Sequence, residues 1–238
     1  MTALTTYRRR VVRTAQHGAA IAIFAAMPPA TLNAAAFIGV ASDRDGQVLP
    51  NAVVVLKPIG QSAPPAAPTT INITQEGLSF KPYVSVLRSG SSVIFANRDT
   101  VEHHIKSFSS SKPFEIAVHR PGDTPAPIQF DREGAIVAYC ILHDWMRAYV
   151  FVADTPWSAV AGESGFARID GVPPGDYELL AWHPDLGQFK PPLSSRVSIG
   201  AVGTTQTTIH FDLKPRPMRR APKSNASEGK SASAHAHH

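Results

Sequence analysis

Short runs of β-branched and aromatic residues recur along this chain, and turn-forming residues such as glycine, proline and aspartate separate them. Residues 52–56, 83–87, 92–97 and 147–152 are examples. Runs of this length are typical of β-strands joined by tight turns. The chain holds 21 prolines and 16 glycines in 238 residues, and nothing in it resembles a long amphipathic helix. We therefore predict an all-β fold, a sandwich or a barrel.

The first 36 residues have the composition of an export signal. A basic stretch (RRRVVR, residues 8–13) precedes an apolar run at residues 19–27 that is too short to span a bilayer, and residues 34–36 are small. The basic stretch also resembles a twin-arginine signal, with Tyr7 where serine or threonine is usual. We expect residues 1–36 to be a signal peptide, and the mature protein to be periplasmic, without stable membrane insertion.

The basic charge of the chain is concentrated at its ends. Four arginines lie in the expected signal, and residues 214–238 carry six lysines and arginines against one glutamate. Residues 37–213 are mildly acidic as a result, so a nucleic-acid partner is not indicated. Residues 214–238 are rich in lysine, arginine, proline, serine and alanine and end in histidines, which predicts a disordered basic tail.

The only cysteine, Cys140, lies in the segment CILHDWM together with His143 and Met146. A strand-like run precedes the segment and another follows it, so we predict that it is a loop joining two strands. A short loop of this kind brings a thiolate, an imidazole and a thioether toward one point. Such soft donors suit copper better than zinc, magnesium or calcium, and a copper site of this type needs a second histidine.

Two candidates for the second histidine, His103 and His104, lie in an upstream strand-like run. Adjacent strand residues point to opposite faces, so one of them is expected to face the metal. Four alternatives to this copper site are open. Cys140 could be a buried structural thiol. A Cys–His hydrolase would need an orienting third residue and an oxyanion hole, a multicopper oxidase would need several His-x-His pairs, and a structural zinc site favours more than one cysteine.

The ligand pattern resembles the cupredoxins, the blue-copper proteins. Their upstream ligand stands in a strand as histidine followed by asparagine and an aliphatic residue, a pattern that residues 103–105 (HHI) approximate, and the Cys-x-x-His-x-x-Met spacing is similar to that of amicyanin. The resemblance implies one copper ion, Cu(I) or Cu(II), bound by His103, Cys140 and His143 with Met146 as an axial ligand. His104 replaces the family's asparagine, and the loop lacks the proline of amicyanin and plastocyanin. These departures leave open whether His104 or Asp144 contributes to the site.

A narrower resemblance rests on four segments, which are residues 95–99, 103–108, 112–115 and 143–146. They resemble exported cupredoxin-like proteins labelled as methylamine utilisation proteins, over about residues 37–186. The label implies no specific role in methylamine metabolism.

The flanking segments resemble a different module. Residues 39–52 and 165–177 look like the early and late strands of carboxypeptidase-regulatory-like or transthyretin-like sandwiches. We predict a cupredoxin-like Greek-key sandwich at residues 70–154, inserted in a smaller β-sandwich that residues 37–62 and 155–213 form. Residues 63–69 are a proline-rich linker and residues 214–238 the tail. One continuous sandwich with extra strands is the simpler alternative.

These features predict an electron carrier and not an enzyme. A rigid β scaffold holds both oxidation states of copper in nearly one geometry, so we expect one-electron transfer between periplasmic redox proteins such as a cytochrome or a dehydrogenase. The alternatives are a periplasmic copper chaperone or storage protein, for which the tail histidines would be useful, and a structural β-sandwich with a degenerate copper site.

Overall fold

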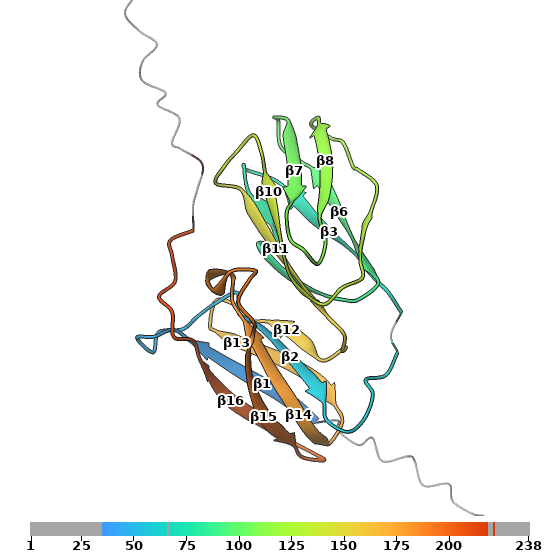
Figure 1. Cartoon of the computed structure of the whole chain (residues 1–238). Helices are drawn as coiled ribbons and strands as arrows, with labels where there is room; N and C mark the ends of the chain where they lie inside the picture. The colour runs from blue at the N-terminus through green and yellow to red at the C-terminus, as the bar shows by residue number, and fades with distance from the viewer. Residues whose placement is uncertain (1–34, 66, 219–220, 222–238) are drawn as a thin grey trace, which may run out of the picture. The chain divides into compact units, whose positions relative to one another are not determined.

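The computed structural model describes residues 35–65, 67–218 and 221 (Figure 1). Its strands are β1 (Ala35–Ser42), β2 (Val53–Pro58), β3 (Thr70–Gln75), β4 (Phe80–Lys81), β5 (Val84–Arg88), β6 (Ser91–Asn97), β7 (His103–Ser107), β8 (Phe114–His119), β9 (Ile128–Phe130), β10 (Gly134–Cys140), β11 (Arg147–Ala153), β12 (Ser158–Val160), β13 (Phe166–Val172), β14 (Gly175–Trp182), β15 (Leu193–Ile199) and β16 (Thr204–His210). The only helical segment in these residues is the single 3-10 turn η1 (Pro184–Leu186). The all-β prediction is confirmed.

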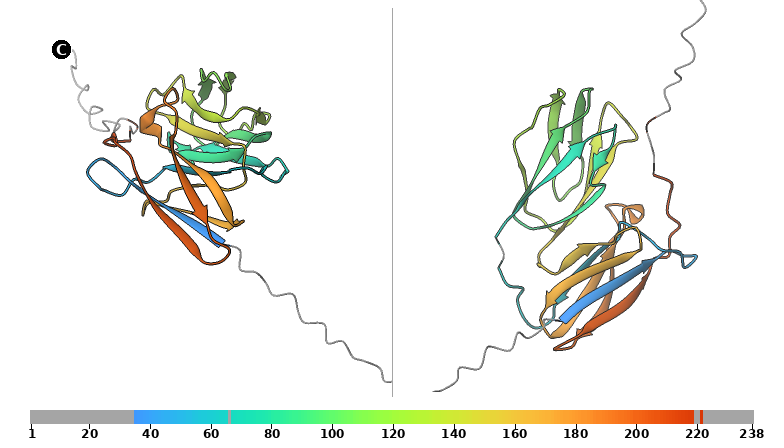
Figure 2. Two further views of the ribbon diagram at one scale, coloured as in Figure 1. Left: turned by 60° about the horizontal axis from the view of Figure 1, so that its bottom comes forward. Right: turned by 180° about the vertical axis from the view of Figure 1, so that it is seen from behind.

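The strands form four sheets, and each sheet draws its strands either from the middle of the chain or from the two stretches on either side of it. The middle stretch of the chain, from β3 to β11 (residues 70–153), builds a five-stranded sheet of order β5-β11-β10-β7-β8 and a four-stranded sheet of order β4-β3-β6-β9. The two outer stretches, β1 and β2 (residues 35–58) and β12 to β16 (residues 158–210), build the sheets β13-β1-β16 and β12-β2-β14-β15. Strands from both outer stretches therefore pair with one another, as Figures 1 and 2 show for β1, β13 and β16. The assignment of these stretches to one interrupted domain stays a prediction.

Each pair of sheets encloses its own hydrophobic core. The core of the middle stretch includes Phe95, Ile105, Phe130 and Ile136, which are fully buried, and it extends to Cys140 and Met146. The core of the outer stretches includes Phe37, Leu56, Tyr177 and Phe211. Burial of this apolar area is the main stabilising contribution to both sandwiches.

Strand β11 is buried on both faces, which explains its uninterrupted apolar sequence. Val150 and Val152 point into the core of the middle stretch, while Tyr149 and Phe151 join a third cluster with Val53, Val55 and Trp182. A strand that is covered on both faces has a continuous apolar sequence and not an alternating one. β11 leaves the CILHDWM loop at Arg147, so the loop is anchored on a strand that packing holds on both faces.

The ends of the chain fall largely outside the described residues. Residues 1–34 of the predicted signal peptide are among them, while Ala35 and Ala36 belong to β1, where Ala36 pairs with Thr204 of β16. The predicted cleavage after about Ala36 would therefore shorten β1. Of the predicted tail, residues 214–218 and 221 are described, and Arg216 forms a 2.8 Å ion pair with Asp185. In the described part of the chain, no helix is long and apolar enough to cross a membrane.

Candidate metal centre

Strand β7 supplies the upstream histidine. Its burial alternates, with His103, Ile105 and Ser107 buried and the residues between them partly exposed. His103 is 0% exposed and points into the molecule. His104 points the other way, and its Nε2 lies 2.7 Å from the Glu115 carboxylate on β8. The alternation of the strand therefore separates the two adjacent histidines, as expected for a period of two.

The CILHDWM segment is a tight loop between β10 and β11, as its position between two apolar runs predicted. Cys140 is the last residue of β10, and Arg147 is the first of β11. The Met146 backbone N–H donates to the His143 carbonyl at 2.9 Å, and the Cys140 N–H donates to the Met146 carbonyl at 3.2 Å. The first bond closes a turn over residues 143–146, and the second joins the two ends of the segment.

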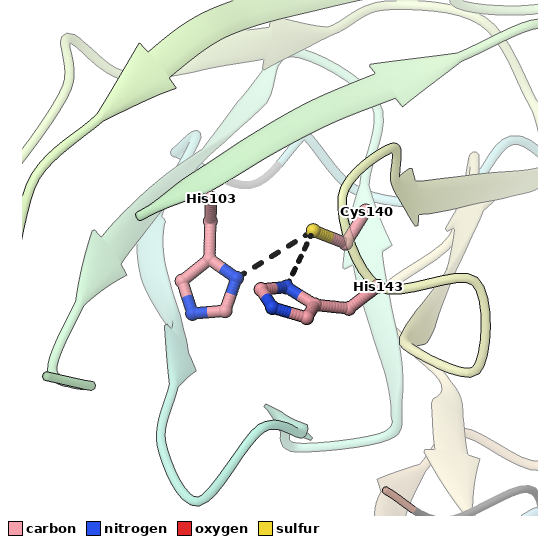
Figure 3. Close-up of side chains that lie close together, drawn as sticks. All are labelled: His103, Cys140 and His143. Carbon is pink, nitrogen blue, oxygen red and sulfur yellow. Dashed lines mark hydrogen bonds between the residues drawn. The ribbon is translucent and has the colours of Figure 1, made fainter. Parts of the chain in front are cut away.

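Three predicted ligands converge where the loop meets β7 (Figure 3). The Cys140 Sγ atom lies 3.5 Å from the Nδ1 atom of His103 and 3.4 Å from the Nδ1 atom of His143. One donor atom from each of the three residues lies within 4.8 Å of the other two. Both imidazoles thus present the same ring nitrogen to the single thiol of the chain.

The spacing of the donor atoms matches what one shared metal ion requires. Bonds of about 2.3 Å to sulfur and about 2.0 Å to nitrogen, meeting at about 110–120°, separate the two donor atoms by about 3.5–3.7 Å. The observed sulfur–nitrogen distances of 3.4 and 3.5 Å are close to this separation. The donor set of one thiolate and two imidazoles is also the one that copper takes in trigonal His2Cys sites.

Met146 stands beside this cluster, buried in the same core as Cys140. Its side chain is 2% exposed, and its backbone is hydrogen-bonded to Cys140. Its assignment as an axial ligand stays a prediction. Asp144 is exposed and is not one of the three residues whose donor atoms converge. The histidines at positions 235, 237 and 238 lie outside the described residues.

Burial of His103 lowers its pKa below the ordinary value of 6.5, although the nearby Asp99 carboxylate opposes the shift. The result favours a neutral imidazole at neutral pH. Metal ions bind the neutral form of histidine, so no proton must be removed from this ring before a metal ion binds.

The structure also bears on the hydrolase alternative, because it supplies the third residue that the sequence did not identify. Asp99 lies 2.8 Å from Nε2 of His103, whose Nδ1 faces the Cys140 thiol. The thiol is only 3% exposed and His103 is fully buried, so a peptide or ester substrate would not reach them in this structure. A hydrolase would also need no second imidazole on the same sulfur. A metal centre accounts for both histidines.

Sequence reasoning did not identify two residues that contact the site. Asp99 holds His103, and Leu78 accepts a hydrogen bond at 3.1 Å from the indole N–H of Trp145, in the ligand loop. Asp99 stands four residues before His103, in the segment between β6 and β7. A carboxylate near a candidate ligand histidine was the available signal for Asp99. Leu78 takes part through its backbone, which leaves no signal in the sequence.

Several solved structures are similar to part of this chain. A purple cupredoxin from Nitrosopumilus maritimus is 24% identical over 34% of this chain and 98% of its own length, with a TM-score of 0.32. A reduced-state variant of amicyanin is 16% identical over 35% of this chain and 82% of its own, with a TM-score of 0.33. A copper-containing nitrite reductase from Thermus scotoductus is 22% identical over 49% of this chain and 28% of its own, again with a TM-score of 0.33.

Neither a protein-family model nor a curated protein matches the chain. The case for a metal centre therefore rests on the geometry of its own residues. The buried Cys140 sulfur lies 3.5 and 3.4 Å from Nδ1 of His103 and of His143, the spacing expected of ligands to one shared metal ion.

Proposed function

We propose that this protein binds one copper ion through His103, Cys140 and His143, with Met146 on the axis, and carries single electrons between periplasmic redox partners. The observation that carries the proposal is the convergence of Nδ1 of both histidines on the Cys140 sulfur at 3.4 and 3.5 Å. Bound copper would supply the Cu(II)/Cu(I) couple. The residues of the chain would hold its ligands in one arrangement during both oxidation states.

Burial of the ligands favours electron transfer over copper handling. Cys140, His103 and Met146 are 3%, 0% and 2% exposed, so three of the four proposed donors are shielded from chelators and from a receiving protein. A chaperone or storage site has to release its ion, which requires donors that a second ligand can reach. The alternative in which the chain stores or delivers copper therefore has less support from the side chains that the structure describes.

The fourth donor offers a route for electrons to the surface. His143 is partly exposed, and its two neighbours Ile141 and Leu142 are 47% and 49% exposed. A partly exposed ligand with two exposed apolar side chains before it in the loop is suited to brief contact with a redox partner, because apolar contacts dehydrate without the strong penalty that charged groups carry. This feature supports a protein partner such as a cytochrome or a dehydrogenase.

The visible spectrum tests the proposal directly. One equivalent of Cu(II) added to the purified exported protein is expected to give an intense thiolate-to-copper absorption that a Cys140→Ser variant lacks. Addition of Zn(II) to the same protein is the control, because a zinc complex has no such band. A reversible one-electron titration, and retention of the copper against a chelator, would then favour electron transfer over copper storage or delivery.

The opposite outcomes separate the alternatives. Copper that binds with no thiolate band and exchanges rapidly with a chelator would favour copper handling. Absence of stoichiometric copper from both the native protein and Cys140→Ser would favour the third alternative, a structural β-sandwich with a degenerate copper site.

A further inference from the structure

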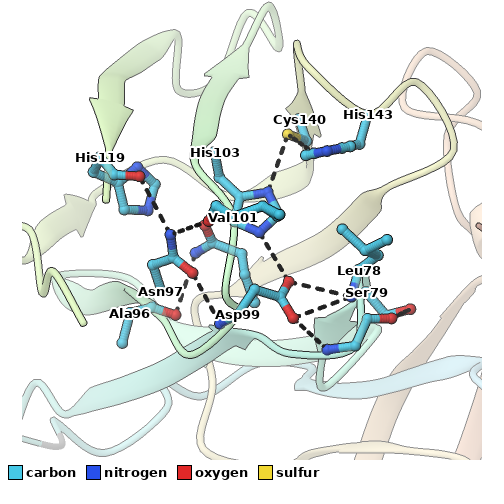
Figure 4. Close-up of polar contacts among 12 residues, drawn as sticks. Leu78, Ser79, Ala96, Asn97, Asp99, Val101, His103, His119, Cys140 and His143 are labelled. Carbon is cyan, nitrogen blue, oxygen red and sulfur yellow. Dashed lines mark hydrogen bonds and ion pairs between the residues drawn. The ribbon is translucent and has the colours of Figure 1, made fainter. Parts of the chain in front are cut away.

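The carboxylate of Asp99 lies directly behind His103, on the side away from Cys140 (Figure 4). Its Oδ2 atom is 2.8 Å from Nε2 of His103, and the two side chains are 9% and 0% exposed. An ionised carboxylate only accepts hydrogen bonds, so this contact is a hydrogen bond when Nε2 of His103 carries the proton. The opposite nitrogen, Nδ1, then keeps its lone pair, which faces the Cys140 sulfur at 3.5 Å.

The backbone of the turn between β3 and β4 fixes the carboxylate. Oδ1 of Asp99 accepts from the Gly77 N–H at 2.6 Å, and Oδ2 accepts from the Leu78 N–H at 3.1 Å. Both turn residues have positive φ, 63° for Gly77 and 52° for Leu78. Consecutive backbone N–H groups in a turn form a concave site for a carboxylate, so the turn holds the Asp99 side chain in place behind His103.

Asn97, at the end of β6, fixes the backbone on either side of Asp99. Its side chain is fully buried, and its Oδ1 accepts from the Asp99 N–H at 2.9 Å. Its Nδ2 donates to the carbonyls of Val101 at 2.8 Å and His119 at 3.2 Å. The segment between β6 and β7 is thereby held to the end of β8, and the Asp99 carboxylate has little freedom to leave His103.

The same turn contacts the second ligand-bearing segment. The Leu78 N–H binds Asp99, while the Leu78 carbonyl accepts from Nε1 of Trp145 at 3.1 Å. Trp145 lies between two proposed ligands in the loop, and its ring centroid is 5.3 Å from that of His143. The backbone of one residue, Leu78, thus connects the support of His103 to the loop that carries the other donors.

We propose that Asp99 is a positioning residue of the metal centre: it holds His103 in the tautomer that offers Nδ1 to the metal, and it makes that imidazole a stronger donor. The second part rests on the proposed copper-binding function; the first is a property of the protein without metal. Carboxylate partners of metal-bound histidines raise ligand basicity, and their loss typically costs about 10–100-fold in metal affinity or activity.

An amide is a poor substitute for the carboxylate in this position. Three N–H groups converge on the two oxygens of Asp99, from Gly77, Leu78 and His103. An asparagine has one oxygen and one NH2 group, so its NH2 group must face either the turn or the imidazole. If it faces His103, it favours the opposite tautomer, with a proton on Nδ1 where the metal would bind. An Asp99→Asn variant therefore tests charge and tautomer while keeping the size of the side chain.

Nitrogen-15 NMR of the metal-free protein tests the tautomer, and it needs no copper. His103 in the native protein is expected to carry its proton on Nε2, and in Asp99→Asn this population is expected to fall. A Glu115→Gln variant is the matched control, because Glu115 holds the adjacent His104 at 2.7 Å on the outer face of β7. An Asp99→Ala variant has no side-chain oxygen to accept from Nε2 in either orientation. The proposal is overturned if native His103 carries its proton on Nδ1, or if the native tautomer population is unchanged in folded Asp99→Ala.

The copper-loaded proteins test the donor strength. A stronger imidazole donor stabilises Cu(II) more than Cu(I). In Asp99→Asn the factor by which Cu(II) affinity falls is therefore expected to be about ten times the factor by which Cu(I) affinity falls. For a one-electron couple this is a rise of about 59 mV in reduction potential. Glu115→Gln is expected to leave the potential unchanged. Equal shifts in both variants, or none in Asp99→Asn, would overturn the second part.

The two experiments separate failure of this proposal from failure of the proposed function. If the native protein shows no thiolate-to-copper band, the copper function fails, and the donor-strength part fails with it. The tautomer result still decides whether Asp99 positions His103.

Discussion

Nε1 of Trp145 donates a hydrogen bond to the carbonyl oxygen of Leu78 at 3.1 Å. Trp145 belongs to the loop between β10 and β11, and Leu78 to the turn between β3 and β4, so the bond connects the two sheets of the middle sandwich. Apolar packing accompanies it, because both side chains lie against the hydrophobic core of that sandwich. The bond restrains the loop that carries Cys140, His143 and Met146.

A Trp145→Phe variant removes this donor and keeps an aromatic ring. We expect it to lower the free energy of unfolding by about 0.5–1.5 kcal/mol, the usual contribution of one hydrogen bond, and to alter the copper spectrum. Trp157→Phe is the control, because its indole N–H donates to the Gly171 carbonyl at 3.3 Å in the other sandwich. That variant should lose similar stability in chemical denaturation. An identical copper spectrum in both variants would show that the Leu78 bond has no role in the centre.

Substitutions of the two adjacent histidines of β7 should affect copper binding to very different extents. His103 is fully buried beside Cys140, whereas His104 is directed to Glu115 at the surface. We expect His103→Gln to weaken copper binding by more than the ~10–100-fold typical of an outer-shell partner, and His104→Gln to have little effect. Copper stoichiometry after gel filtration measures both. A larger loss in His104→Gln would reverse the assignment of the upstream ligand.

His183 should make the stability of the protein depend on pH. Its side chain is 7% exposed, its Nε2 lies 3.1 Å from the Pro50 carbonyl and its Nδ1 accepts from the Asp185 N–H at 3.1 Å. Burial lowers the pKa of His183 below 6.5, and the Asp185 carboxylate opposes the shift. The unfolded chain therefore binds this proton more readily than the folded protein. The stabilisation is present above about pH 6.5 and is lost as the pH falls toward the lower pKa of the folded state.

Denaturation of the metal-free protein at about pH 7.5 and about pH 5.5 measures this effect. The native protein is expected to lose more stability on acidification than His183→Gln, which has no group to protonate at this position. Metal-free protein is required because copper binding to His103 would add its own pH dependence. Parallel losses in the two proteins would mean that His183 titrates alike in the folded and unfolded states.

A substitution at Phe95 tests how strongly the hydrophobic core stabilises the sandwich that carries the site. Phe95 is fully buried in β6, two residues before Asn97, and its ring contacts those of Phe80 and Phe114 at centroid distances of 6.3 and 5.6 Å. Phe95→Ala is expected to cost about 3–5 kcal/mol through lost burial and the cavity that remains. Phe189→Ala, at a position 83% exposed, should change stability by less than about 0.5 kcal/mol. Comparable unfolding midpoints for the two variants would contradict this assignment of the core.

The sequence alone predicted the all-β class, because strand runs and turn residues are local signals that neighbouring residues determine. It also predicted the loop between β10 and β11, since an apolar run stands on each side of CILHDWM. The alternation of β7 predicted that the two adjacent histidines would face opposite sides, and the structure places His103 inward and His104 outward.

Only the tertiary structure could assemble the centre and its support. Cys140 and His103 are 37 residues apart, and their contact depends on the pairing of β10 with β7. Asp99 and Leu78 meet because a turn presents its backbone N–H groups to a carboxylate 21 residues away, and backbone groups carry no residue identity that a sequence could show. The sequence therefore determined which donors are present and that the two adjacent histidines of β7 face opposite sides. Strand pairing and buried backbone hydrogen bonds decided which of them meet.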